Sequence, residues 1–253
     1  MICNVVIPCF RESERLPIFL ADLVKHLATQ DFLGRVTIVD DGSGKDEVQR
    51  TRARVEQVLQ AFPAAQVGWL LLPANQGKGG AVYAGWKKAI TEDADILAFA
   101  DADGSTSGAE VCRIVHGLIE RAGTVDAVFG SRIKMLGQDI QRELYRHLMG
   151  RCFATLVGEM TGLLAYDTQC GAKAIKASAF EGIASKLHER GFAFDVELTL
   201  ALLNSGYRVI ELPISWREVP GSKVRFLRDI IRMAMAILRI RKRHGRFAAA
   251  GKP

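Results

Sequence analysis

The segment Ile96-Leu97-Ala98-Phe99-Ala100-Asp101-Ala102-Asp103-Gly104 decides the fold class of this chain. Its apolar first half predicts a strand, and two carboxylates one residue apart follow that strand directly. Carboxylates at the end of a strand can hold a hard cation such as Mg²⁺ and, through it, a diphosphate. The same short motif also occurs in solvated turns, so the pair by itself leaves both interpretations open.

Similar apolar runs recur along the chain, separated by segments with a helical pattern. Strands are predicted at residues 5–7, 36–39, 67–71, 96–99 and 127–129, and helices near 14–30, 45–61, 79–91 and 108–122. A further helix is expected over residues 139–160. This alternation predicts an α/β fold in which a mostly parallel sheet is flanked by helices. Polar or glycine residues follow most of these strands. Since ligands of such sheets bind beyond the carboxyl ends of the strands, one shared site is expected there.

Two more strand-end segments carry candidate binding groups. Asp40-Asp41-Gly42-Ser43 can accept hydrogen bonds from a base or a ribose, or can form an Asx-turn that reverses the chain. Asn75-Gln76-Gly77-Lys78-Gly79-Gly80-Ala81 precedes a predicted helix, where backbone N–H groups favour an anion. A flexible turn with a solvated lysine is the alternative. The glycine spacing fits neither a Walker loop nor G-x-G-x-x-G, which argues against an ATPase and a Rossmann dehydrogenase.

The composition is that of one globular domain with at most a small appendage: 253 residues, 49% of them hydrophobic. The five cysteines form no CxxC pair, which argues against a disulfide scaffold and a zinc site. The net charge of +6 is uneven, because residues 217–253 hold eleven Lys and Arg against two acidic residues. The rest of the chain is slightly acidic. Such a basic tail predicts an anionic partner surface, either a membrane or a nucleic acid.

In this order the motifs resemble family-2 glycosyltransferases of the GT-A fold. The resemblance rests on Val6-Ile7-Pro8-Cys9-Phe10-Arg11-Glu12-Ser13-Glu14-Arg15-Leu16 and on residues 39–43, 75–81, 100–104 and 130–132. Residues 167–173, 192–198 and 218–224 are similar to dolichyl-phosphate β-glucosyltransferases and their prokaryotic relatives. Phe10-Arg11 stands where that family usually has Tyr-Asn. The Q-x-x-R-W motif of processive members is absent, which argues against a polysaccharide synthase.

The resemblance implies a role for each matching residue. Asp101 and Asp103 would bind ribose and the diphosphate through Mg²⁺ or Mn²⁺, and Asp41 with Asp40 would hold the base and ribose. Arg132 and Lys223 would engage phosphates, and Asp167 and Gln169 would lie at the sugar and acceptor. The implied catalytic residues are Asp103, Asp167 and Arg132, and the implied donor-binding residues are Pro8, Glu12, Asp40, Asp41, Lys78, Asp101, Ala102, Gln169 and Lys223. For Asp195 a simple helix cap competes with a functional role.

The resemblance also implies an activity. A GT-A domain over residues 1–223 is expected to transfer a hexose, most simply glucose from UDP-glucose, to a polyprenyl or dolichyl phosphate with inversion. The alternatives are GDP-mannose or a UDP-N-acetylhexosamine as donor to the same lipid. A nucleic-acid-binding protein that uses the basic tail is the alternative from another class. The acidic clusters at the strand ends argue against it, because they would repel phosphates without a metal. No oligomeric state is predicted.

The last segment, residues 224–253, predicts a basic amphipathic helix from about Val224 to His244 and a tail. On a helical wheel one stripe holds Arg225, Arg228, Arg232, Arg239, Arg243 and Arg246, and the opposite side holds Phe226, Ile230, Met233, Ile237 and Ile240. This pattern is typical of a helix that lies in a membrane interface, although a helix packed on the domain is the alternative. With no predicted signal peptide or transmembrane helix, a peripheral position on the cytoplasmic face of a membrane is expected.

Overall fold

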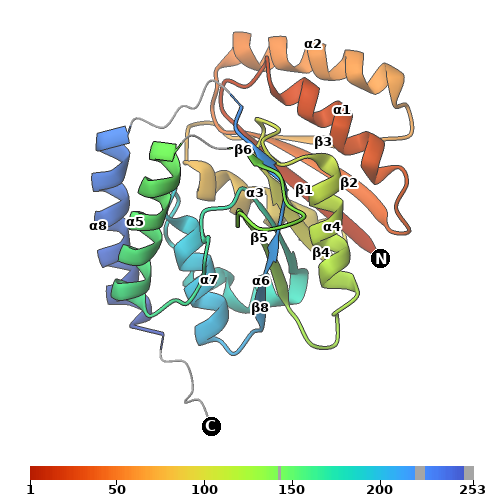
Figure 1. Ribbon diagram of the computed structural model, residues 1–253. Helices are drawn as coiled ribbons and strands as arrows, with labels where there is room; N and C mark the ends of the chain where they lie inside the picture. The colour runs from red at the N-terminus through yellow and green to blue at the C-terminus, as the bar shows by residue number, and fades with distance from the viewer. Residues whose placement is uncertain (142–143, 220–225, 248–253) are drawn as a thin grey trace.

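The computed structural model describes residues 1–141, 144–219 and 226–247, which form an α/β fold around one large sheet (Figure 1). The sheet has seven strands in the order β3-β2-β1-β4-β7-β5-β8. In chain order they are β1 Ile2–Cys9, β2 Leu33–Asp40, β3 Gln66–Leu71, β4 Ile96–Ala100, β5 Ala127–Ser131, β7 Ala172–Lys176 and β8 Val209–Pro213. All neighbours are parallel except β7, which runs antiparallel to β4 and β5. The predicted mostly parallel sheet is confirmed.

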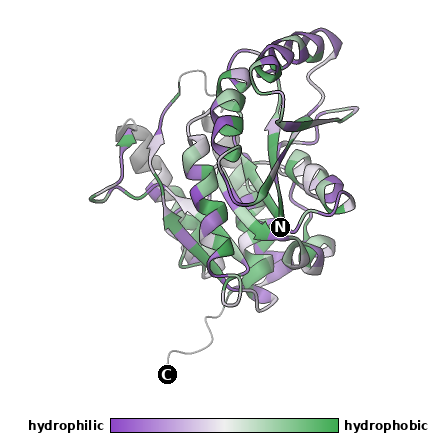
Figure 2. Cartoon of the chain, turned by 90° about the vertical axis from the view of Figure 1, so that its right-hand side faces the viewer, coloured by the Kyte–Doolittle hydropathy of each residue, from purple (hydrophilic) through white to green (hydrophobic). Residues whose placement is uncertain are grey.

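Helices cover both faces of this sheet, because successive strand residues point to opposite sides. On one face α1 (Leu16–Leu27), α2 (Lys45–Ala61) and α4 (Gly108–Ile119) pack with Cys3, Val5 and Ile7 of β1. On the other face α3 (Lys78–Thr91), α6 (Ala177–Ile183) and α7 (Phe194–Asn204) pack with Val6 of the same strand. Figure 2 shows that the strands between these helix layers carry mainly hydrophobic residues.

A third cluster attaches the last helix to the domain. Figure 1 shows α5 (Leu144–Thr161) and α8 (Phe226–His244) side by side, next to α7. Ile237 and Ile240 of α8 are fully buried in a cluster with Val157 of α5 and Leu200 of α7. The prediction that Ile237 faces lipid is therefore wrong, since the protein itself covers that side chain. The predicted boundary between residues 223 and 224 lies outside the described residues.

Charged contacts hold α8 in the same place. Arg239 is 3.1 Å from Glu189, and Arg243 is 3.3 Å from Glu197, whose side chain is fully buried at the start of α7. Part of the predicted arginine stripe thus pairs with carboxylates of the domain. The side chains of Arg225, Arg228, Phe226 and Ile230 lie outside the described residues.

The region between β5 and β7 also differs from its prediction. A helix was expected from residue 139, but Ile140–Gln141 forms a short strand, β6, which pairs with β9 (Trp216–Arg217). The helix α5 begins only at Leu144. A short 3₁₀ helix, Ala184–Lys186, follows α6. The pairing of β6 with β9 brings the loop after β5 to the last segment before α8.

One ion pair lies inside the protein. Lys173 of β7 and Asp195 of α7 are 0% and 1% exposed, and Lys173 Nζ lies 2.6 Å from Asp195 Oδ1. The same Nζ donates hydrogen bonds to the carbonyl oxygens of Thr168 and Cys170 at 3.1 and 2.7 Å. Asp195 makes no side-chain cap of α7. This pair therefore fastens the loop before β7 to helix α7.

Breaking this pair should destabilise the fold. Lys173→Met leaves a buried carboxylate without its partner, and we expect the free energy of unfolding to fall by about 3–5 kcal/mol. Urea denaturation followed by circular dichroism measures the change. The double variant Lys173→Met/Asp195→Leu removes both charges and should be more stable than the single variant. Equal stability of the wild type and Lys173→Met would contradict this account.

Candidate active site

The carboxyl ends of β1, β2 and β4 meet at one edge of the sheet and surround a cavity of about 730 Å³. Seven of the predicted site residues line it: Pro8, Glu12, Asp41, Lys78, Asp101, Ala102 and Asp103. Asp40, Arg132, Asp167 and Gln169 are not among the lining residues, and Lys223 lies outside the described part of the chain. The seven residues thus lie together on one side of the cavity, and their roles at a donor stay predictions.

The two acids after β2 organise their own loops. Asp40 is buried and accepts a hydrogen bond from the backbone N–H of Ser43, three residues further on, at 2.8 Å. Asp41 accepts hydrogen bonds from the backbone N–H groups of Gln76 and Gly77 at 2.6 and 2.9 Å. Burial raises the pKa of Asp41, although these two bonds oppose the shift. Asp40 therefore shapes the turn, and Asp41 joins that turn to the glycine-rich loop.

The glycine-rich loop packs tightly against the segment before α7. Gly77 has a φ of 85°, and a Cβ atom on it would clash with the carbonyl oxygen of Arg190. A Cβ atom on Gly79 would clash with the side chain of Phe194. Both positions require glycine because backbone and ring approach so closely. Helix α3 begins here, so its N-terminus points toward the cavity with Lys78 in the first turn.

Lys78 connects the loop to the carboxylate pair. Its Nζ lies 2.7 Å from Asp101 Oδ1 and 5.3 Å from the centre of the Phe99 ring. Burial alone would lower the pKa of Lys78, but the nearby carboxylates of Asp101 and Asp195 outweigh it and raise the pKa. Lys78 is therefore a fixed positive charge at the cavity wall.

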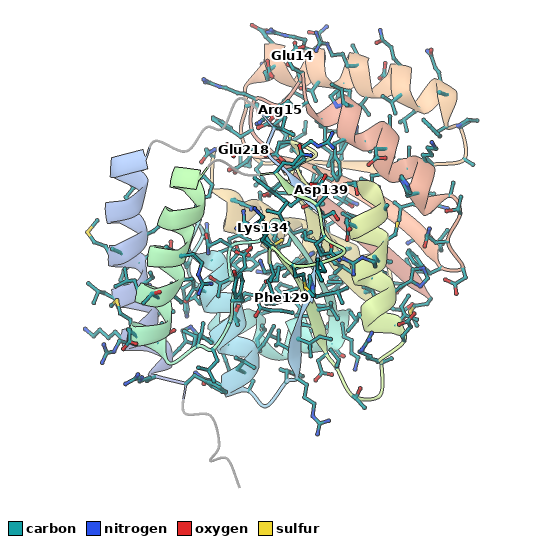
Figure 3. All side chains as sticks on the ribbon, viewed as in Figure 1. Glu14, Arg15, Phe129, Lys134, Asp139 and Glu218 are labelled. Carbon is teal, nitrogen blue, oxygen red and sulfur yellow. The ribbon has the colours of Figure 1, made fainter. Side chains whose placement is uncertain are left out.

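Asp101 and Asp103 lie close together at the end of β4. Burial and the negative charge of Asp101 raise the pKa of Asp103, whose Oδ2 is 4.0 Å from Arg15. Arg15 in turn binds Glu12 through Nε and Nη2, and Figure 3 shows it at the start of α1. A bound cation would relieve the repulsion between the two carboxylates. In the described ranges no three acidic, His or Cys side chains gather as metal ligands.

The position of Asp101 depends on Gly171. A Cβ atom at residue 171 would collide with the Asp101 carboxylate, and the backbone N–H of Asp101 donates to the carbonyl oxygen of Gly171 at 2.9 Å. Gly171 belongs to the segment Asp167–Lys173, which the antiparallel strand β7 brings beside β4. Two segments far apart in the chain thus share the carboxylate site.

Arg132 and Asp167 form an ion pair away from the cavity lining. Arg132 Nε and Nη2 bind the two carboxylate oxygens of Asp167 at 2.6 and 2.8 Å. This pairing holds the pKa of Asp167 well below its usual range, against the effect of burial. Glu211 of β8 accepts the backbone N–H groups of Tyr166 and Asp167 at 2.7 and 2.8 Å. The guanidinium of Arg132 thus donates two hydrogen bonds to Asp167. Its predicted contact with a substrate phosphate stays a prediction.

Sequence reasoning missed the other side of the cavity. That side consists of Glu189, Gly191, Phe192, Ala193, Arg232, Met233, Met235, Ala236 and Arg239. Arg232 and Arg239 were predicted to face a membrane, but the packing of α8 places them at the cavity. A helical wheel cannot reveal this, because it shows which residues share a stripe and not what that stripe faces.

A cavity with strand-end carboxylates, a glycine loop at a helix N-terminus and a lysine between them suits a nucleotide diphosphate bound through a cation. The fold and this site define a GT-A glycosyltransferase. The chain belongs to glycosyl transferase family 2, whose family model matches residues 4–183.

Individual relatives agree with this assignment. The dolichyl-phosphate beta-glucosyltransferase of Saccharomyces cerevisiae is 31% identical over 250 residues, which cover 94% of this chain and 73% of the relative. The human protein of the same name is 30% identical and covers 95% of this chain, and 75% of its own length is matched. Among solved structures, glucosyl-3-phosphoglycerate synthase from Mycobacterium tuberculosis with Mn²⁺, UDP and phosphoglyceric acid has a TM-score of 0.65 at 16% identity; the match covers 98% of this chain and 80% of that one. This similarity confirms the fold.

The contact between Gly171 and Asp101 yields a direct test. Gly171→Ala pushes the Asp101 carboxylate away from its position, and we expect kcat/KM for glycosyl transfer to fall by about 100-fold, since small displacements of catalytic groups cost that much. Gly123→Ala is the matched control, because nothing lies within 4 Å of a Cβ atom there. Both variants should keep a cooperative thermal transition. Wild-type kinetics of Gly171→Ala would show that the position of Asp101 does not matter for transfer.

Proposed function

We propose that this enzyme transfers glucose from UDP-glucose to a polyprenyl phosphate of the dolichyl type. The observation that carries the proposal is the identity of 30–31% over nearly the whole chain with dolichyl-phosphate beta-glucosyltransferases of yeast and human. The cavity supports it, because one side carries carboxylates for a metal-bound diphosphate and the other side carries arginine and methionine. These groups suit a phosphate joined to a hydrocarbon chain.

The donor occupies the side built by β1, β2 and β4. Pro8 and Asp41 line this side, where the nucleoside would bind, and Asp101 and Asp103 would hold a divalent cation between themselves and the diphosphate. That cation, Mg²⁺ or Mn²⁺, would neutralise charge on the departing UDP. The solved relatives from Mycobacterium tuberculosis with UDP and Mg²⁺ or Mn²⁺ support this assignment. Lys78 adds a fixed positive charge beside Asp101.

The reaction is a direct displacement at C1 of the sugar. An oxygen of the lipid phosphate forms the new bond to C1 while the bond from C1 to the diphosphate breaks, and UDP leaves with the electron pair. The anomeric configuration inverts. A phosphomonoester loses its second proton with a pKa of about 6, so the attacking oxygen is already anionic near neutral pH. Catalysis therefore rests on positioning and on stabilising the leaving diphosphate.

We propose supporting roles for Asp167 and Gln169. Asp167 is bound by Arg132 and keeps a low pKa, so it suits positioning better than proton abstraction. The side-chain nitrogen of Gln169 is buried and has no hydrogen-bond partner among the residues that the structure describes. Gln169 is not among the residues that line the cavity, so a contact of this nitrogen with a sugar hydroxyl or a phosphate oxygen stays a prediction.

Other donors and another class of function make different predictions. GDP-mannose and UDP-N-acetylhexosamines are the alternative donors to the same lipid. Nucleic-acid binding through the basic C-terminal segment is disfavoured, because the cavity beside α8 carries Asp41, Asp101 and Asp103. These carboxylates repel a polyphosphate unless a cation intervenes.

Transfer assays with a panel of donors test the proposal. With Mg²⁺ or Mn²⁺ present, UDP-glucose should give a glucosyl lipid phosphate, and a chelator should abolish the product. Asp103→Ala should lower turnover by about 100-fold or more, because one charge-stabilising group is lost. The control Glu120→Ala should not, because Glu120 is an exposed acid just after α4. Faster transfer from GDP-mannose or tighter binding of GDP than of UDP would refute the glucose assignment.

We also propose that the enzyme works at the cytoplasmic surface of a membrane. Support comes from the basic segment 217–253 and from exposed apolar side chains on α5 and α8, namely Leu156, Met235 and Leu238 at 40%, 48% and 57% exposure. Among the helices described, none is both long and apolar enough to cross a bilayer. Each basic residue near an anionic surface contributes about 1 kcal/mol, and salt screens that part of the attraction.

Vesicle sedimentation tests this surface. Anionic vesicles should bind the protein, and moderate salt should weaken the binding without abolishing it. Leu238→Glu should reduce binding about tenfold, since it removes an apolar contact and adds a repelled charge. The control is Ile18→Glu, because Ile18 is 75% exposed on α1, on the other face of the sheet (Figure 1). Failure of the wild type to bind anionic vesicles at low salt would refute the membrane proposal.

A further inference from the structure

Helix α8 supplies a continuous strip of the cavity wall. Arg232, Met233, Met235, Ala236 and Arg239 all line the cavity, together with Phe192 before α7. Arg232 and Arg239 are seven residues apart, which is about two turns of helix, so they lie on the same side of α8. The carboxylates and the glycine-rich loop on the other side come from the first half of the chain.

The cations of this cavity differ in how they are paired. Arg15 binds Glu12, Lys78 binds Asp101, and Arg239 binds Glu189 at 3.1 Å. Arg232 is exposed and makes no ion pair or hydrogen bond with any residue in the described ranges. Its guanidinium is therefore available for a ligand, and an arginine fork binds phosphate oxygens through two parallel hydrogen bonds.

Helix α8 is also fixed firmly enough to position that arginine. Ile237 and Ile240 are fully buried against α5 and α7. Arg243 and the side chain of His244 contact Glu197 at 3.3 and 3.2 Å. The anchors lie one to three turns after Arg232, so the backbone near the cavity has a defined place.

We infer that Arg232 binds the phosphate of the acceptor and that Met233 and Met235 contact the beginning of its hydrocarbon chain. The inference rests on the proposed function and adds a site to it. An inverting displacement needs the attacking oxygen on the face of C1 opposite the leaving diphosphate. Since the donor groups occupy the strand-end side, the α8 side remains for the acceptor. Methionine side chains are flexible and polarisable, which suits an irregular hydrocarbon surface.

A short, water-soluble prenyl phosphate such as geranyl phosphate tests the site without membrane binding. In Arg232→Ala we expect KM for geranyl phosphate to rise by about 10- to 100-fold, as for the loss of a charge-assisted hydrogen bond, while KM for UDP-glucose stays unchanged. Arg232→Lys should restore binding only in part, because lysine lacks the fork. Arg241→Ala is the matched control, since it removes the same charge from an exposed position of α8 that does not line the cavity.

Calorimetry completes the test. Geranyl phosphate should bind the UDP-loaded wild type and Arg241→Ala equally and Arg232→Ala more weakly, and the thermal transition and UDP affinity should be the same in all three. A raised KM for UDP-glucose alone would place Arg232 at the donor instead. Equal acceptor binding by Arg232→Ala and Arg241→Ala would overturn the inference while leaving the transfer activity intact. If the wild type glucosylates no prenyl phosphate, the proposed function itself fails.

Discussion

Two lysines hold together carboxylates that would otherwise repel one another beneath the cavity. Lys173 pairs with Asp195 in the interior, and Lys78 pairs with Asp101 at the cavity wall and also interacts with Asp195. The chain of alternating charges joins β7, α7, α3 and the end of β4. Because a buried charge is tolerated only with a partner, these four elements must assemble together. The rest of the site depends on that assembly, since it fixes both the glycine-rich loop and the carboxylate pair.

Several acidic residues that the sequence suggests as ligand-binding groups instead accept hydrogen bonds from other residues of the protein. Asp40 closes its turn, Asp41 holds the glycine-rich loop, and Asp167 is taken by Arg132. The groups left for substrate are fewer. One of them is the carboxylate of Asp103, which lines the cavity. In such a site the loops and side chains are held in place before a ligand binds, so ligand binding has to order few of them.

Local patterns in the sequence were enough to predict the strand-end side of this site. Apolar runs followed by Asp, Gly or Pro mark the ends of β1, β2 and β4, and parallel strands bring such ends together. The remainder depends on contacts between distant segments. No local pattern showed that Ala172–Lys176 runs antiparallel between β4 and β5, or that Glu211 would support Asp167. The amphipathic pattern correctly predicted the helix α8. It did not show whether the apolar side of α8 packs on a membrane or on α7, and only the packing of Ile237 and Ile240 in the structure distinguishes these two possibilities.

The two sides of the cavity come from opposite ends of the chain, and this has an evolutionary consequence. Turns after β1, β2 and β4 form one side, and α8 forms much of the other. Arg232, Met233 and Met235 belong to α8, whereas the chain of alternating charges lies on β7, α7, α3 and the end of β4. In a lineage of this family, the side chains of the last helix that face a second substrate can therefore change. The residues at the strand ends, which would bind the nucleotide, stay under separate selection. New specificities can arise by altering a few positions of one helix, without rebuilding the fold.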